Sequence, residues 1–156
     1  MKRNQTELAY LRAAVQNASP VGLVILLLDQ LINDLKRAIA AMEGRDVEAR
    51  SAELKHGFLV LAQLEGSLDM ENGGQAAINC SRFYSSVRAA MMKAHIKIDP
   101  SILVCQIGLL LNVRQAWQQV DKSNLPSAAG TAAAGATAQP PAAAEEPSVV
   151  STDWTA

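Results

Sequence analysis

Aromatic residues are scarce in this chain of 156 residues, at 4% of the composition, whereas hydrophobic residues make up 49%. The core must therefore be built mainly from Leu, Ile, Val, Met and Ala, and this mixture suits packed helices better than sheets. The formal net charge is only −1, which leaves no basic surface of the kind that nucleic acids attract. The composition thus favours an all-α protein and argues against a nucleic-acid-binding regulator.

Cysteines and long apolar runs are also few. The two cysteines, Cys80 and Cys105, fall inside predicted helices, where we expect buried reduced thiols and no disulfide. The apolar run over residues 21–28 is far too short to span a bilayer. No apolar run follows the basic start of the chain before Val21, so we expect no signal peptide, no membrane insertion and a cytoplasmic protein.

The stretch from Ser19 to Met42 predicts a long helix. Ser19 can cap its first N–H groups, Pro20 suits its first position, and Gly44 is expected to supply the left-handed residue at its end. One apolar stripe is ordinary core, but a second strip flanks it and further leucines widen it, namely Val21, Leu23, Ile25, Leu26, Leu27, Ile32 and Ile39. A helix that buries one face needs an apolar arc of roughly 100°. Either several helices surround this one, or part of its surface awaits a partner.

Three more helices are expected over about 46–68, 75–97 and 100–120, with a glycine-containing turn before the second of them. Their connections are short, so sequential helices should be antiparallel neighbours. In the helix over 75–97 the predicted inner stripe is Ala76, Cys80, Phe83, Val87, Ala90, Met91 and Ala94. The first half of the last helix, like the helix from Ser19 to Met42, is more apolar than one buried face requires.

The two ends of the chain differ from this body. Residues 6–15 predict a helix that is too short to be stable alone. After Leu125, small residues and proline dominate, and they bury too little surface to offset the entropy of ordering. We therefore predict an N-terminal segment over 1–17, an antiparallel four-helix bundle over 18–122 and a disordered tail over 123–156.

Chemical motifs are weak. Glu53 and His56 have the Glu-x-x-His spacing of di-iron bundles, but no second copy exists, and His56 is expected to point away from the inner stripe. No nucleophile–base arrangement, phosphate-binding loop or Cys-x-x-Cys is present. We therefore expect no catalytic residue, no metal and no cofactor. The surplus of apolar surface instead indicates a binding protein.

Several motifs, in this order and spacing, resemble the flagellin export chaperones of the FliS family. They are Tyr10, Ala18-Ser19-Pro20, Leu28-Asp29, Leu68-Asp69-x-Glu71-x-Gly73-Gly74, Phe83-Tyr84, Asp99-Pro100 and Arg114-Gln115-Ala116-Trp117. The resemblance covers about residues 6–121. It implies an antiparallel helical bundle that holds the C-terminal segment of newly made flagellin, prevents premature polymerisation and presents flagellin to a component of the export gate. It also implies that residues 1–17 act as a lid, with Tyr10 as the lid tyrosine.

We expect cargo to bury its apolar side chains along the helix from Ser19 to Met42 and along the last helix. The predicted cargo-binding residues are Tyr10, Ile25, Leu28, Ile32, Ile107 and Leu111. The alternative is a structural helical bundle that homodimerises through the same apolar strips. A size measurement separates them, since the chaperone should form a complex with flagellin and an obligate dimer should ignore it.

Overall fold

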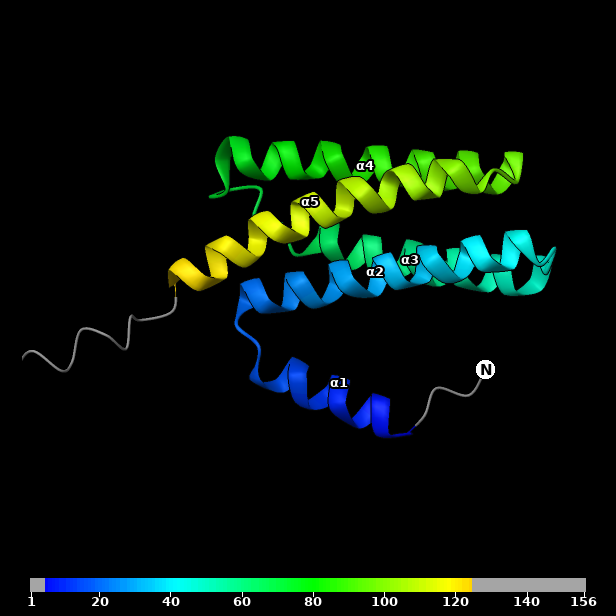
Figure 1. Ribbon diagram of the computed structural model, residues 1–156. Helices are drawn as coiled ribbons and strands as arrows, with labels where there is room; N and C mark the ends of the chain where they lie inside the picture. Colours follow the sequence, from blue (N-terminus) through cyan, green and yellow to red (C-terminus); the bar gives the residue numbers. More distant parts are fainter. Residues whose placement is uncertain (1–4, 125–156) are drawn as a thin grey trace, which may run out of the picture. The chain divides into compact units, whose positions relative to one another are not determined.

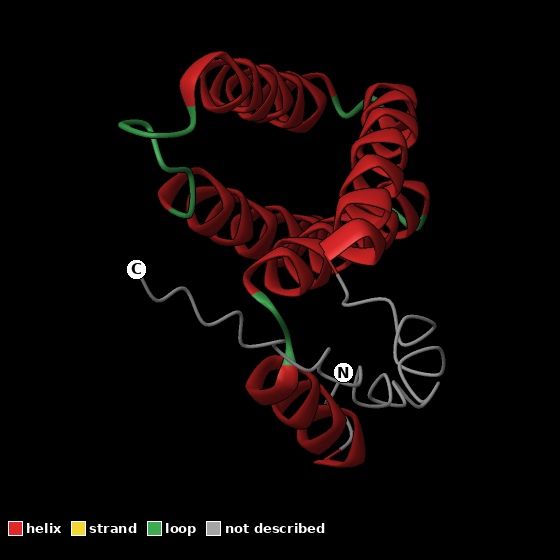
Figure 2. Ribbon diagram, turned by 90° about the vertical axis from the view of Figure 1, so that its left-hand side faces the viewer, coloured by secondary structure: helices red, strands yellow, loops and turns green. Residues whose placement is uncertain are grey.

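A computed structural model describes residues 5–124, which form five helices joined by short connections (Figure 1). The helices are α1 (Gln5–Asn17), α2 (Pro20–Glu43), α3 (Val47–Gly66), α4 (Gly74–Lys97) and α5 (Pro100–Asn124). α2 packs against α3 and α5, and α4 packs against the same two helices. The result is an antiparallel four-helix bundle. Figure 2 shows the bundle in a view turned by 90°, roughly along the helices. The predicted all-α bundle, preceded by a short N-terminal helix, is confirmed.

The C-terminal boundary differs slightly from the expectation. α5 continues to Asn124, so Ser123 and Asn124 are helical and do not belong to a tail. The remainder of the predicted disordered tail, residues 125–156, lies outside the described residues.

Short polar side chains begin the bundle helices at the positions that the sequence indicates. Ser19 Oγ accepts a hydrogen bond from the Gly22 N–H at 2.9 Å. The same hydroxyl donates to Asp121 Oδ1 at 2.8 Å, which ties the start of α2 to the last turns of α5. Asp46 Oδ1 accepts from the Ala49 N–H at 2.9 Å and caps α3. Each cap satisfies a donor that the helix cannot satisfy itself.

The end of α2 contradicts one expectation. Gly44 has φ −76° and is right-handed, and the left-handed residue is Arg45, with φ 56°. The Asp46 N–H donates to the Ala41 carbonyl at 2.9 Å, and the Arg45 N–H donates to the Met42 carbonyl at 3.2 Å. This pattern is a Schellman motif, in which the residue after the cap is the left-handed one. The reversal therefore falls one residue later than the glycine.

The core lies between all four bundle helices and consists largely of aliphatic side chains. Its fully buried members include Leu28, Leu31, Leu35, Leu54, Leu61, Leu64, Tyr84, Val87, Met91, Leu103 and Leu110. Ion pairs also join neighbouring helices outside this core. Arg114 on α5 donates hydrogen bonds to both carboxylate oxygens of Asp29 on α2. Arg88 on α4 forms an ion pair with Glu65 on α3 at 2.6 Å. Burial of apolar side chains therefore holds the bundle together, and these partly exposed ion pairs add only a small contribution.

Candidate functional site

An apolar cleft lies beside the N-terminal half of α2. Its volume is about 710 Å³, and it is lined by Val15, Pro20, Val21, Leu23, Val24, Leu26, Leu27, Gln30, Gln63, Ser67 and Trp117. The lining comes from the end of α1, the end of α3 and the second half of α5 as well as from α2. A cleft of this size with so few polar side chains is the usual form of a binding site.

The origin of the cleft is the uninterrupted apolar sequence of α2. Every residue from 21 to 27 is partly accessible, and Leu28 is the first that is fully buried. Neighbouring helices therefore cover the C-terminal half of α2 more completely than its N-terminal half. Leu23, Leu26 and Leu27 now line the cleft, so the widened apolar arc noted in the sequence corresponds to an incompletely covered surface.

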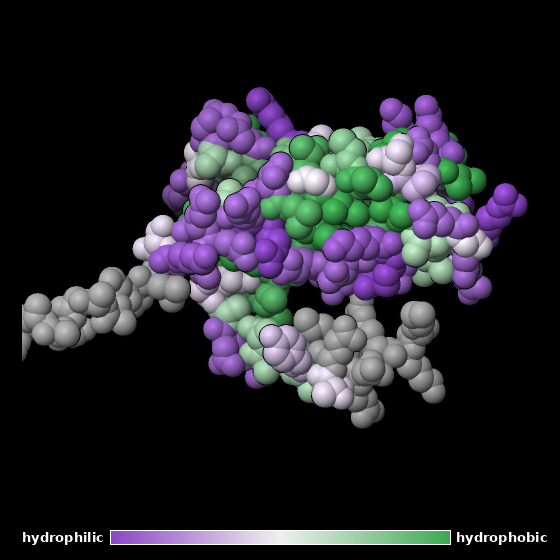
Figure 3. Space-filling view, viewed as in Figure 1, coloured by the Kyte–Doolittle hydropathy of each residue, from purple (hydrophilic) through white to green (hydrophobic). Residues whose placement is uncertain are grey.

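A second apolar area lies on α5. Val104 is 58% exposed and Leu111 is 47% exposed, and they lie seven residues apart on one face of the helix. Ile107, between them, is partly buried and packs against the core. Figure 3 shows hydrophobic side chains gathered along α5 on this face of the bundle, bordered by hydrophilic side chains. We call the surface of Val104, Ile107 and Leu111 the α5 strip.

The six predicted cargo-binding residues fall into three environments. Leu28 is fully buried and Ile32 is 3% exposed, so both belong to the core. Ile25 is partly exposed and lines a shallow hollow of about 340 Å³ next to α5. Ile107 and Leu111 lie in the α5 strip. Tyr10, on α1, is 75% exposed, whereas Val15 of the same helix borders the cleft. The six predicted residues include neither Leu26, which the sequence analysis named only as widening the apolar arc, nor Trp117, although both line the cleft.

A smaller cavity of about 290 Å³ adjoins the cleft. Tyr84, Cys80, Ala77 and Asp69 help to line it, and it shares Val24, Ser67 and Trp117 with the cleft. Burial, and secondarily the nearby Cys80, raises the pKa of Tyr84 to about 12, and burial also raises the pKa of Cys80. The structure differs from the inner stripe predicted for this helix at two positions. Tyr84, which the stripe omitted, is 1% exposed, whereas Ala76, which the stripe included, is exposed.

The thiols differ from the expectation at one position. Both cysteines are free, as predicted, but only Cys80 is partly buried, and Cys105 is exposed. The expectation of burial is therefore wrong for Cys105, because it lies on the side of α5 that no other helix covers.

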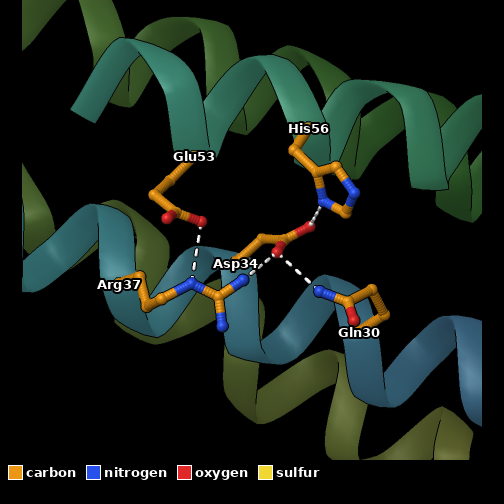
Figure 4. A network of polar contacts seen from close by, with 5 residues as sticks. All are labelled: Gln30, Asp34, Arg37, Glu53 and His56. Carbon is orange, nitrogen blue, oxygen red and sulfur yellow. Dashed lines mark hydrogen bonds and ion pairs between the residues drawn. The ribbon is translucent and has the colours of Figure 1, made fainter. Parts of the chain in front are cut away.

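Glu53 and His56 take part in a polar network between α2 and α3, centred on Asp34 (Figure 4). Asp34 is fully buried. Its carboxylate accepts from Gln30 Nε2 at 2.8 Å and from Arg37, and it lies 2.6 Å from His56 Nδ1. Arg37 also donates to Glu53 at 2.8 Å. His56 thus turns toward α2 and is not simply a surface residue.

This arrangement suits a structural role. Arg37 occupies the space between the carboxylates of Asp34 and Glu53. Within residues 5–124, no group of three or more His, Cys, Asp or Glu side chains has the geometry to hold a metal ion. In the same range, no helix combines the length and apolarity needed to cross a membrane. The Glu-x-x-His spacing is therefore explained by ion pairing between two helices.

Comparison with known proteins identifies the family. The family model described as "Flagellar protein FliS" matches residues 2–124. The flagellar secretion chaperone FliS of Salmonella typhimurium is 32% identical over 109 residues, which cover 69% of this chain and 81% of that protein. The flagellar secretion chaperone FliSB of Pseudomonas aeruginosa is 29% identical over 110 residues, covering 70% and 87%. FliS of Vibrio cholerae is 28% identical over 116 residues, covering 72% and 85%. A family match over most of the chain shows that this protein belongs to the FliS family of flagellar export chaperones and is not an enzyme.

Proposed function

We propose that this protein is a cytoplasmic chaperone for the C-terminal segment of flagellin. It prevents premature polymerisation of flagellin and assists its delivery to the export apparatus, where it meets a component of the export gate. The observation that carries the proposal is the apolar cleft of about 710 Å³, which the described residues leave open beside α2. An apolar groove of this kind suits an amphipathic or extended segment of another polypeptide.

The α5 strip extends the proposed contact beyond the cleft. A segment that is unfolded when free loses conformational entropy on binding, so a long contact is needed to offset that loss. Burial of roughly 1,000 Å² of apolar surface contributes about 25 kcal/mol before the ordering costs are deducted. The α5 strip adds accessible apolar side chains, Val104 and Leu111, to those that line the cleft.

We assign different roles to the six predicted residues. Ile25 and Leu111 are accessible and contact cargo directly, and Ile107 is the less exposed member of the α5 strip. Leu28 and Ile32 do not contact cargo, because they have almost no accessible surface. Their role is to pack in the core and so support the accessible residues of α2. Tyr10 belongs to a lid that includes α1, and Val15 at the edge of the cleft is where this lid would begin to cover it.

The direct test measures binding of flagellin, and of flagellin that lacks its C-terminal segment, by calorimetry and size-exclusion chromatography. We expect the intact protein to form a one-to-one complex and the truncated one to form none. Leu111→Asp should weaken binding at least about a hundredfold, because a carboxylate would be buried without a partner. The matched control is Leu59→Asp, since Leu59 is 62% exposed on α3 and lines none of the cavities described above.

Two results would contradict the proposal. Equal binding of intact and truncated flagellin would place the recognised segment elsewhere in flagellin. An obligate dimer that ignores flagellin would favour the alternative, a structural bundle that homodimerises through its apolar strips.

Two further experiments test delivery and localisation. The chaperone–flagellin complex should be retained by the immobilised export-gate component, and the protein should fractionate with the cytoplasm.

A further inference from the structure

One end of the bundle contains a buried cation without a counter-ion. We call it the distal end: α2 and α4 end there, and α3 and α5 begin there (Figure 1). Arg50, near the start of α3, is only 9% exposed, and its Nε is buried without a hydrogen-bond partner. Within residues 5–124 no carboxylate forms an ion pair with it. A guanidinium keeps its charge in a protein, so its burial without a counter-ion is costly.

The carboxylates nearest to Arg50 along α3 do not supply that counter-ion. Asp46 caps the first turn of the helix, and Glu53 pairs with Arg37 at 2.8 Å. Glu48 is exposed and lies two residues away, a spacing at which helical side chains do not face each other. Arg50 also lies close to the positive end of the α3 dipole, which disfavours a cation and favours an anion. An anion from another molecule would therefore be stabilised here.

Exposed apolar side chains accompany the cation at the distal end. Val47, the first residue of α3, is 61% exposed, and Ile98, between α4 and α5, is 55% exposed. Ile98 also has a left-handed backbone, with φ 54°, which is sterically costly for a β-branched residue. Strain of this kind is concentrated at sites that bind a partner. An apolar surface beside an unpaired cation suits a polypeptide that presents apolar side chains next to a carboxylate.

The α5 strip leads toward the distal end. Val104, its first member in the sequence, lies four residues after Pro100, which is about 6 Å along the helix. The cleft lies at the opposite end of the bundle, because its lining includes Pro20 at the start of α2 and Ser67 after the end of α3. A segment that occupies the cleft and then follows the α5 strip would therefore finish at the distal end.

We propose that the distal end holds the C-terminal carboxylate of the bound flagellin segment, with Arg50 as its counter-ion. The last apolar side chains of the segment pack on Val47 and Ile98. A guanidinium suits this position because its N–H groups match the two oxygens of a carboxylate. The terminal carboxylate is preferred to an acidic side chain because a C-terminal segment always carries one at its last residue, where this path finishes. The inference rests on the proposed function.

The first test compares the flagellin C-terminal segment as a free acid with the same peptide amidated at its C-terminus. Amidation removes one negative charge and leaves every side chain unchanged. We expect it to weaken binding to the wild-type protein about 10- to 100-fold, the range for a hydrogen bond to a charged group. On Arg50→Met, which keeps an apolar stem without the charge, the free acid and the amide should bind equally weakly.

Stability measurements separate a ligand contact from a merely structural role. Free Arg50→Met should unfold at the same urea concentration as the wild-type protein or at a higher one, because a buried unpaired charge is lost. An arginine that only supports the fold would lower the midpoint instead. The matched control is Lys55→Met, since Lys55 is an exposed cation on the same helix. It should leave the affinity and the effect of amidation unchanged.

A cross-linking experiment tests the direction of the segment. A peptide with a bromoacetyl group on a side chain near its C-terminus is added to Val104→Cys or to Leu23→Cys, each combined with Cys80→Ser and Cys105→Ser. Val104→Cys should react at least about tenfold faster, because the tethered group has the higher effective concentration there. Faster reaction of Leu23→Cys, in the cleft lining, would show the opposite direction and would overturn the proposal.

The outcomes separate this inference from the proposed function. If the wild-type protein binds the free acid and the amide equally, the terminal site is wrong and the chaperone role stands. If it does not bind the segment at all, both are overturned. If amidation weakens binding to the wild-type protein and to Arg50→Met to the same extent, another group holds the carboxylate and the assignment of Arg50 is overturned. Coupling of Arg50 to an internal acidic residue of the segment, without any effect of amidation, would overturn the terminus as the source.

Discussion

Replacing Asp34 by alanine tests whether the polar network between α2 and α3 stabilises the bundle. Asp34 is fully buried, and its carboxylate contacts Gln30, Arg37 and His56. Removing one member of a fully buried ion pair typically costs about 3–5 kcal/mol, because the remaining charge is stranded. Here the side chains of Arg37 and His56 are each 40% exposed, and Arg37 keeps its contact with Glu53. We therefore expect a smaller loss, of about 2 kcal/mol.

The loss is measured by urea denaturation at pH 7, followed by circular dichroism at the helix band. The midpoint should fall while its slope stays constant, because the surface exposed on unfolding is unchanged. Asp34→Asn keeps the size and one acceptor, so it should lose about 1 kcal/mol. The control is Asn33→Ala, since Asn33 is adjacent on α2 but exposed. A loss below about 0.5 kcal/mol for Asp34→Ala, within the range of ordinary surface substitutions, would show that desolvation of Asp34 cancels its contacts and would refute the reasoning.

Three further predictions concern backbone strain and pH. Arg45→Gly should raise the free energy of unfolding by up to about 1 kcal/mol, because Arg45 is left-handed, whereas Gly44→Ala should bring no such gain; urea denaturation checks both. In a Tyr10→Phe background, absorbance titration should show the Tyr84 phenol ionising near pH 12. Because that pKa is raised on folding, stability should fall as pH rises from about 10 to 12, and Tyr84→Phe should abolish this fall in alkaline denaturation. Hydrogen bonds, first from the Asn72 N–H, hold the pKa of Asp69 below its ordinary 3.8; thermal unfolding should therefore show that Asp69→Ala loses stability at pH 7 but not at pH 2.

The helices, their caps and the fold class could be read from local sequence. Ser19 and Asp46 begin helices as predicted, because a cap depends on residues within one turn of it. The left-handed residue after α2 was misplaced at Gly44, because the hydrogen bonds to Ala41 and Met42 decide where the chain reverses. Periodicity likewise excluded Tyr84 from the inner stripe of α4. A stripe predicts a face of a helix, but the neighbours that cover this face set its true centre.

The amino-acid sequence by itself determined that α2 and α5 carry more apolar surface than a four-helix bundle consumes. It did so because helical periodicity fixes which side chains share a face. Only the tertiary structure decided which part of that surplus stays accessible. Leu28 and Ile32 are buried, whereas Leu23 and Leu26 line a cleft, since coverage depends on where α3 and α5 lie. Packing of α2 against α3 likewise placed His56 beside the buried Asp34.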